Sequence, residues 1–593
     1  MKDLKTFYIN RIAQVTSNEA RFHKRAQLFS AGRLAIAFFA LICLWKAVTT
    51  VSTIWINLVL VGILLFLIVV WLDARANKKQ RYFNRLKTIN ERENAALGGD
   101  FVTFQTGENY LDPKHPFTFD LDIFGANAVF QLVNRTCTPS GELLLAQSLT
   151  TGSFGETTII ERQMAISELS TLVDFRQSFL AIGQEMKEKP EDIKELISWL
   201  NSPMSFANRS FIRLLSFLLP TIILTIVAIV IAGYLRFSFI ILFALINLAF
   251  LQFYHRLIDK IHATVSRKQL LLEKYAQLFK LISTQVFKDT HLQAMNTDSK
   301  KATQAVQKLS VIIGFFDQRL NDLVAFFSNG FLLCDLHCIA ALDKWKKNHK
   351  KELIPWLDSL FKIDELNSLA NFAFNHPGYV YPTIQNLVFI EAEQLGHPLI
   401  KDRACVLNDF FSSAQEKVVI LTGANMSGKS TFLRSLGVNL VLAAAGAPVF
   451  AKSFCFNSAA IYSSMRVTDS LGQDTSYFYA ELKRLGEIMK NLRDGKNMVI
   501  LLDEILKGTN SADKLHGSVG LVEEFLEHNC FCIVATHDLA LGELERKYPG
   551  RVINYCFESE ITNGELYFDY KIRRGIAQNK NASFLMRQSG LIK

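Results

Sequence analysis

The segment GANMSGKS at residues 423–430 decides the fold of the C-terminal part of the chain. It matches the pattern G-x-x-x-x-G-K-[ST], a glycine-rich loop that lies between a strand and a helix. The apolar residues 418–421 before it predict a buried strand, and residues 431–442 after it predict a helix. Such a loop closes backbone N–H groups around phosphate oxygens at a helix N-terminus. The expected phosphate-binding residues are Gly423, Ala424, Asn425, Met426, Ser427, Gly428, Lys429, Ser430 and Thr431.

Two acidic residues and a histidine follow apolar strand patterns further along the chain. Residues 498–502 (MVILL) lead into Asp503 and Glu504, and residues 531–535 lead into Thr536 and His537. Taken alone, the two acids are reasonably explained as caps of a strand end, and a hydrogen-bonded loop histidine is the better explanation of His537. Because they accompany the glycine loop, we interpret them as parts of one nucleotide site.

Each residue of that site has an expected role in phosphoryl chemistry. Lys429 is expected to contact the β- and γ-phosphates of ATP, while Ser430 and Asp503 hold Mg²⁺. Glu504 is expected to orient or deprotonate the attacking water. His537 lies just beyond a strand end, where open α/β sheets bind ligands, and can sense the γ-phosphate. The sequence therefore predicts an ATP hydrolase with ATP and Mg²⁺ as cofactors.

These motifs resemble those of the MutS family of ATPases, which are relatives of the ABC ATPases. Residues 422–431 (TGANMSGKST) match the family loop TGxNMxGKST, and residues 501–509 (LLDEILKGT) with Asp513 match its LLDExxxGTxxxD block. Thr536-His537 followed by Glu543-Leu544 is similar to its TH…EL switch. Upstream, residues 121–125 (LDIFG) and residues 134–141 (NRTCTPSG) resemble the start of the MutS core, and the Gly396-His397-Pro398 turn resembles the element that opens the family's ATPase domain. The resemblance implies an ABC-type P-loop ATPase domain behind a helical lever.

A further resemblance concerns assembly. Residues 469–481 (DSLGQDTSYFYAE) are similar to the family's signature segment, although Asp474 and Tyr477 replace its usual glycine and threonine. In the family this segment reaches across a dimer and places its serine on the partner's nucleotide. The resemblance therefore implies a homodimer in which Ser476 acts in trans.

Four apolar runs, at residues 34–44, 54–72, 214–235 and 237–253, pair into two hairpins. The second and third are uncharged for about twenty residues, enough to cross a hydrocarbon core of ~30 Å. Lysine and arginine flank the hairpins on one side, which predicts a multi-pass protein of the cytoplasmic (inner) membrane with both termini and the ATPase in the cytosol. Buried core helices are the alternative, and a cleaved signal peptide is a second alternative for the first run. Polar residues such as Asn57 and Asn247 are so few that an anchor is favoured over a transporter pore.

The predicted fold is an α/β P-loop (ABC-type) ATPase domain at the C-terminus, preceded by a mainly α-helical lever and core with two transmembrane hairpins. Its second hairpin occupies the position where MutS relatives insert a DNA-gripping clamp, and the first hundred residues lack their Phe-x-Glu wedge. The chain thus resembles a divergent, membrane-anchored member without the mismatch-recognition domain. The expected segments are a basic stretch (1–33), a hairpin (34–73), a linker and first core part (74–205), a second hairpin (206–256), the second lever part (257–395) and the ATPase domain (396–593).

Two functions are compatible with these features of the sequence. The first is a dimeric membrane ATPase that moves its lever, its membrane segments or an unidentified membrane partner in contact with lipid. The alternative is a DNA-binding MutS-family protein of mismatch repair or recombination tethered to the membrane. The net charge of +10 does not choose between them, because basic residues beside membrane spans also bind lipid headgroups.

The nine cysteines are scattered and fit a reducing compartment. Cys334 and Cys338 with His337 could hold a metal ion, but no second ligand pair follows them in the sequence. We therefore expect buried core thiols at these positions.

Overall fold

The computed structural model describes residues 2–50, 52–152, 155–203, 210–266, 268–400, 404–466, 477–506, 510–562 and 565–578. The chain divides into two compact units. Unit 1 comprises Met1–Gly98, Cys137–Gly141 and Val173–Asp364, and unit 2 comprises Gly99–Thr136, Glu142–Leu172 and Glu365–Lys593. Within the described residues every regular element of unit 1 is a helix, whereas unit 2 contains the sheets. A mainly helical N-terminal part and an α/β C-terminal part are thus confirmed.

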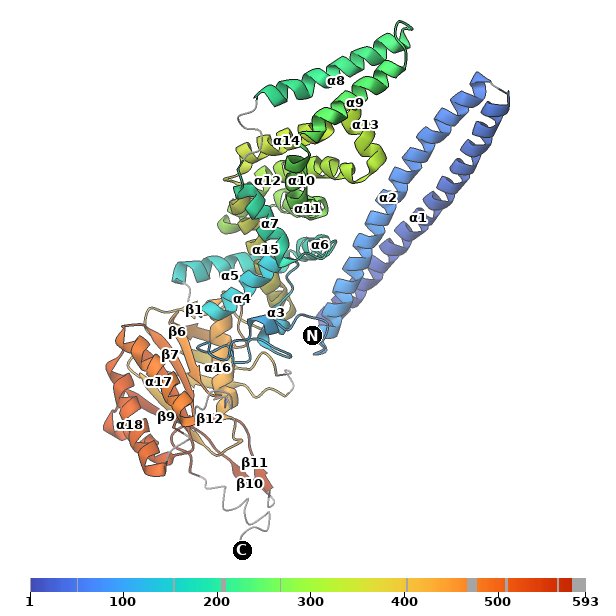
Figure 1. The fold of residues 1–593 in the computed structure, drawn as a ribbon. Coiled ribbons are helices and arrows are strands. Elements are labelled where there is room, and N and C mark those ends of the chain that lie inside the picture. The colour runs from blue at the N-terminus through green and yellow to red at the C-terminus, as the bar shows by residue number, and fades with distance from the viewer. Residues whose placement is uncertain are drawn as a thin grey trace. The chain divides into compact units, whose positions relative to one another are not determined.

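Unit 2 is built on a six-stranded sheet with the order β12-β9-β4-β8-β7-β6 (Figure 1). All neighbouring strands are parallel except β12, which pairs antiparallel with β9. The central strands are buried at every residue or nearly so, as expected for a parallel sheet covered on both faces. The strands are β4 (Val418–Gly423), β6 (Ala460–Ser464), β7 (Met498–Asp503), β8 (Cys530–Thr536), β9 (Val552–Phe557) and β12 (Ile572–Arg574).

Helices cover the two faces of this sheet. One face packs its alternate residues, such as Ile420 and Ile500, against α17 (Tyr477–Arg493) and α18 (Ser511–Glu527). The other face packs against α16 (Lys429–Ala444), where Gly437 lies directly on Leu501. This arrangement places the N-terminus of α16 at the carboxyl ends of the parallel strands, the edge at which such sheets bind ligands.

The remaining elements of unit 2 surround that sheet. A second sheet has the order β1-β5-β2-β3, and β10 pairs with β11 as a short hairpin. The strands are β1 (Thr383–Ile384), β2 (Glu391–Leu395), β3 (Asn408–Phe411), β5 (Ser453–Phe456), β10 (Glu560–Thr562) and β11 (Glu565–Tyr567). The helices are η1 (Glu108–Tyr110), α3 (Val129–Val133), α4 (Pro139–Thr151), α5 (Glu156–Thr171), η3 (Leu539–Glu543) and α19 (Leu544–Lys547); α4 begins within unit 1.

Unit 1 begins with two long antiparallel helices, α1 (Lys2–Thr50) and α2 (Thr53–Ala96). Their polar ends pack with α6, where Val15, Leu86 and Ala181 share a small core. The other helices are α6 (Val173–Gly183), α7 (Pro190–Asn201), α8 (Ser210–Ile231), α9 (Ser238–Gln252), α10 (His255–Val265), α11 (Gln269–Thr284), α12 (Thr290–Asp317), η2 (Gln318–Leu320), α13 (Asp322–Leu332), α14 (Cys334–His349) and α15 (Leu353–Asn375), which ends within unit 2.

The described helices include three that are long and apolar enough to cross a membrane, within α1, α2 and α8. The pairs α9 with α10 and α13 with α14 pass the same test only together, across bends of 71° and 80°. The fourth expected span therefore differs from the other three, because α9 has only 15 residues. The first run, expected to be short, is part of a helix of 49 residues.

The expectation of buried thiols at Cys334 and Cys338 is wrong, because both side chains are partly exposed. All nine cysteines are free. The part of the chain that the structure describes holds no group of three or more His, Cys, Asp or Glu side chains arranged to bind a metal.

Candidate functional site

The glycine loop joins β4 to α16 and depends on glycine at both ends. Gly423 and Gly428 have φ angles of 155° and 108°, in the region that favours glycine. A Cβ on Gly423 would lie 2.9 Å from the carbonyl oxygen of Phe557, and one on Gly428 would lie 3.2 Å from the ring of Tyr570. A side chain at either position would therefore force the loop away from its neighbours.

Lys429 begins α16 and is only 5% exposed. Its Nζ donates hydrogen bonds to the carbonyl oxygens of Gly423 and Ala424, at 2.7 and 2.8 Å. The buried Oγ of Ser427 has no hydrogen-bond partner. A buried ammonium, an unsatisfied hydroxyl and the positive end of a 16-residue helix all meet at this loop, which makes it suited to an anion.

The acids at the end of β7 and the histidine beyond β8 come together across neighbouring strands. Asp503 is in register with Ala535, and the Glu504 amide donates to the Ala535 carbonyl at 2.8 Å. Nδ1 of His537 lies 3.4 Å from Oε1 of Glu504. The structure thus brings together Glu504 and His537, the residues to which the sequence analysis assigned water activation and γ-phosphate sensing, next to Asp503, the expected Mg²⁺ ligand.

A cavity of about 610 Å³ opens in front of the loop. It is lined by most of the residues predicted from sequence, namely Asn425, Met426, Gly428, Lys429, Ser430, Thr431, Asp503 and Glu504. Gly423, Ala424 and Ser427 form the loop without lining the cavity, and His537 stands outside its lining. A volume of this size is typical of sites for nucleotide-sized ligands.

The residues present fit Mg²⁺ together with a nucleotide. Ser430 and Asp503 both line the cavity and offer hydroxyl and carboxylate oxygens, the ligands that Mg²⁺ prefers. This ion is usually held by few protein ligands together with substrate phosphates and water. The residues at the loop and at the end of β7 are thus sufficient to supply the few protein ligands that Mg²⁺ needs.

Sequence reasoning missed several residues of the cavity wall. His397 is the most informative, because burial and then repulsion from Arg434 lower its pKa to about 4. It is therefore a neutral side chain at physiological pH, suited to packing or hydrogen bonding rather than to charge. Its signal in the sequence is the His-Pro turn, which by itself indicates only a family resemblance. The other missed wall residues are Leu395, Ile400, Ala404, Cys405, Val406, Asn408, Phe432, Ser435, Phe557 and Tyr570.

The loop after β7 is held by a residue of the signature segment. Glu481, on α17, is 3% exposed, and its Oε1 accepts a hydrogen bond from the Leu506 amide at 2.5 Å. Glu504 and Leu506 have φ angles of 54° and 59°, which are unfavourable for side chains of this kind. The contact from Glu481 therefore fixes a strained turn that begins with the expected catalytic carboxylate.

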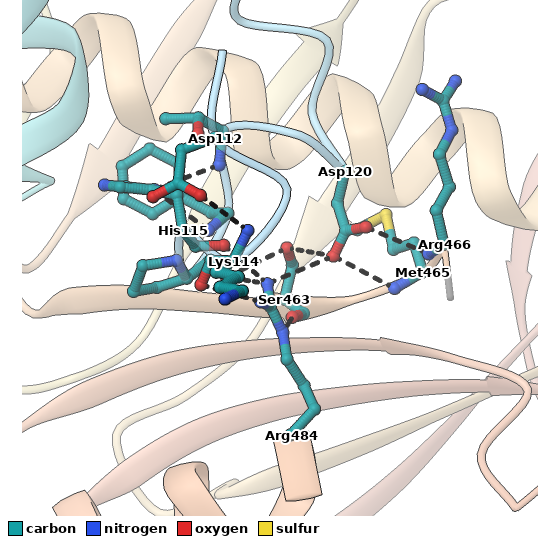
Figure 2. A network of polar contacts seen from close by, with 11 residues as sticks. Asp112, Lys114, His115, Asp120, Ser463, Met465, Arg466 and Arg484 are labelled. Carbon is teal, nitrogen blue, oxygen red and sulfur yellow. Dashed lines mark hydrogen bonds and ion pairs between the residues drawn. The ribbon is translucent and has the colours of Figure 1, made fainter. Parts of the chain in front are cut away.

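A polar network attaches residues 112–122 to the end of β6 (Figure 2). The buried Asp120 carboxylate accepts from Ser463 Oγ at 2.7 Å and from the amides of Met465 and Arg466 at 3.2 and 3.0 Å. Arg484, on α17, donates to the carbonyl oxygens of His115, Pro116 and Ser463. The network therefore anchors both β6 and α17, which flank residues 467–476 in the sequence.

The neighbouring Asp122 joins this network to α16, the helix that follows the glycine loop. Its carboxylate receives two hydrogen bonds from Arg466, at 2.6 and 2.9 Å, and lies 3.6 Å from Arg434 of α16. Burial lowers the pKa of Arg434, as does repulsion from Arg466, while Asp122 and Asp503 oppose this effect. Asp122 is thus the counter-charge shared by Arg434 and Arg466, and Arg434 also interacts with Asp503.

Part of the predicted site lies outside the described residues. This applies to Ser476, the residue expected to act in trans, and to Gly508 and Thr509 of the block after β7.

Comparison with known proteins agrees with this geometry. Residues 419–589, which contain the loop, β7 and β8, match the family described as MutS domain V. The C-terminal region of the chain is similar to MutS proteins. DNA mismatch repair protein MutS from Thermotoga maritima is 29% identical over 248 residues, which cover 41% of this chain and 31% of that protein.

Two further relatives come from eukaryotes. DNA mismatch repair protein Msh3 from Dictyostelium discoideum is 30% identical over 255 residues, covering 40% of this chain and 17% of that protein. MutS protein homolog 4 from Mus musculus is 30% identical over 234 residues, covering 38% of this chain and 24% of that protein. The chain therefore spans less than a third of the length of each of these three relatives.

Proposed function

We propose that this chain is a membrane-anchored, MutS-like ATPase that works as a homodimer. In this proposal, binding and hydrolysis of ATP change the conformation of the helical unit and of its membrane segments. The observation that carries the proposal is the convergence of Lys429, Ser430, Asp503 and Glu504 on one cavity, within a region similar to MutS domain V.

Each residue of the site has a role that follows from its position. Lys429 exchanges its two carbonyl partners for phosphate oxygens, and the amides at the start of α16 bind the same phosphates. Ser430 and Asp503 hold Mg²⁺, which neutralises charge on the phosphates when bound. Glu504 orients the attacking water and accepts its proton, and His537 reports the presence of the γ-phosphate to the end of β8.

The membrane part of the proposal is supported by surfaces of unit 1. Large apolar side chains stand exposed along α1, α2 and α8, for example Phe38 at 68% and Leu64 at 60%. Exposing so much apolar surface to water along helices of this length would cost free energy. On α2 the run of exposed large apolar side chains ends at Trp71, two residues before the buried Asp73, which pairs with Arg33 of α1 at 3.3 Å. This pattern fits a hairpin anchored in the cytoplasmic membrane with its polar end in the cytosol.

The ATPase is tested on full-length protein in lipid nanodiscs. Lys429→Ala is expected to abolish nucleotide binding, whereas Glu504→Gln is expected to keep binding and lower kcat by roughly 10²–10⁴-fold, the usual contribution of a general base. Lys452→Ala is the matched control, because Lys452 is an exposed lysine paired with Glu393. Wild-type turnover by Lys429→Ala would show that the site is assigned wrongly.

DNA binding is the alternative function, and it is favoured by the names of the similar proteins, several of which are DNA mismatch repair proteins. The net charge of +10 is compatible with it. The same nanodiscs are therefore assayed with homoduplex, mismatched and branched DNA. Stimulation that falls steeply with salt would establish the DNA function, and absence of binding at low salt would exclude it.

A further inference from the structure

Helix α13 is an apolar helix whose large side chains are mostly exposed. Its sequence is DLVAFFSNGFL, and of its 11 residues only Asn329 and Gly330 are buried. Leu323 is 73% exposed and Phe327 is 58% exposed. This helix therefore shows no polar face along most of its length.

The one buried side of α13 rests on α9, the second helix of the apolar hairpin (Figure 1). Nδ2 of Asn247 donates a hydrogen bond of 2.7 Å to the Gly330 carbonyl, and Gly330 lies against Ala244. Asn247 was one of the few polar residues within the expected spans. It therefore fastens α13 to the hairpin through small and polar groups, leaving the large side chains of α13 free of this contact.

Both ends of α13 return to a polar layer of unit 1. Leu333, with a φ of 50°, turns the chain by 80° into α14, and the Asp335 amide donates to Asn329. At the other end Arg319 pairs with Asp335 at 3.0 Å and with Asp259 at 2.8 Å. A helix of 11 residues is about 16 Å long, too short to cross a hydrocarbon core of ~30 Å. The chain therefore enters and leaves α13 on the same side.

The contact with Asn247 sets the depth of α13 relative to α9. Asn247 lies five residues before the end of α9 at Gln252, which is about 8 Å along the helix axis. Beyond that end α10 turns away by 71° and carries charged residues such as Arg256 and Asp259. Gly330 thus lies within about 8 Å of the polar boundary, the depth of helices that lie in the headgroup and acyl boundary.

We propose that α13 is embedded in lipid as a non-spanning helix, in the leaflet that faces α10 and α14. Its partner is the acyl chains of the phospholipids around the α8–α9 hairpin, because α13 contacts both of these helices and, like them, carries exposed large apolar side chains. This inference rests on the proposed function, in which that hairpin crosses the membrane. It adds a direct mechanical link, because α12 leads into α13 through η2 and any movement of α12 is resisted by lipid.

The test places the photo-crosslinking residue p-benzoylphenylalanine at Leu323 or Phe327 in the full-length protein, expressed in membranes that contain phospholipids with an alkyne tail. Two further positions serve as matched controls. Leu242 on α9 is 51% exposed on the apolar hairpin, and Lys301 is an exposed polar position on α12. After irradiation, lipid adducts are measured by mass and by fluorescent labelling of the alkyne.

Adducts at Leu323 and Phe327 comparable to those at Leu242, with at least tenfold fewer at Lys301, are the expected result. Adducts at Leu242 but not at the two α13 positions would overturn this inference while leaving the membrane anchor intact. Crosslinks from α13 to a protein band instead of lipid would overturn it as well, because they would show a protein interface. Absence of adducts at all four positions would overturn both this inference and the membrane part of the proposed function.

Discussion

At the scale of single residues, the site combines groups that are individually unfavourable in the folded chain. Glu504 and Leu506 have left-handed backbones, Lys429 is a buried charge, and Ser427 is a buried hydroxyl without a partner. Strained and unsatisfied groups persist where the surrounding contacts hold them in one conformation, and such groups are concentrated at functional sites. Glu481 supplies one such contact. His397 adds a contribution to folding stability that depends on pH.

Replacing Glu481 by alanine is expected to lower kcat by at least tenfold with a smaller change in the KM for ATP. The buried Leu506 amide would lose its acceptor, at a cost of about 1–3 kcal/mol, and the turn that carries Glu504 would relax. Glu481→Gln keeps an acceptor oxygen and should restore most of the rate. Steady-state ATPase kinetics in nanodiscs measures both variants. Equal kcat for the wild type and the alanine variant would contradict a positioning role.

His397 is expected to make unit 2 sensitive to acid. Its folded pKa of about 4 lies below the ordinary value of 6.5, so its stabilising contribution is complete above pH 6.5 and is lost as the pH falls through 4. The shift corresponds to about 3 kcal/mol. The midpoint temperature of thermal unfolding should therefore fall more between pH 7 and pH 4 for the wild type than for His397→Gln. Parallel losses in the two proteins would show that His397 does not cause the acid sensitivity.

At the scale of elements, sequence reasoning succeeded where the signal was local. Strands β4, β7 and β8 are short apolar runs, each followed by the residues that form the site, so their pattern could be read directly. Asp122 and Arg466 are 344 residues apart, and nothing local in either segment indicates the other. Helix α13 is only 11 residues long, too short for its apolar character to stand out from the helices around it.

The Asp122 network yields a prediction about how elements are coordinated. Asp122→Asn removes the charge but tolerates the φ of 51° at this position, so the fold should remain intact. Arg434 and Arg466 would then repel each other near Asp503, and we expect kcat to fall several-fold. Stability should change by no more than about 1 kcal/mol, because the pair is partly exposed.

The matched control for this substitution is Glu393→Gln, which removes a carboxylate from the exposed ion pair with Lys452. It should leave both kcat and the unfolding temperature unchanged. A loss of activity shared by both variants would point to a general effect of net charge. Wild-type activity of Asp122→Asn would show that Arg434 and Arg466 need no counter-charge.

At the scale of the whole molecule, the proposal depends on a composite site shared by two chains. One chain supplies Lys429, Asp503 and Glu504. The resemblance to MutS implies that Ser476 of a second chain completes the site. A closed two-fold dimer would contain two such sites, each built from both chains. Two inactive variants can therefore complement each other in such a dimer, whereas they cannot do so if each chain holds a complete site.

Lys429→Ala and Ser476→Arg are each expected to abolish hydrolysis when expressed alone, because every site in either homodimer lacks one half. Co-expression should restore activity, since a mixed dimer has one site with an intact Lys429 facing an intact Ser476. With random pairing, half the dimers are mixed and each has one working site, so roughly a quarter of wild-type ATPase activity is expected. Different affinity tags on the two variants allow the mixed dimer to be purified and assayed. If that dimer forms and remains inactive, Ser476 does not act in trans, and the two-chain site must be abandoned.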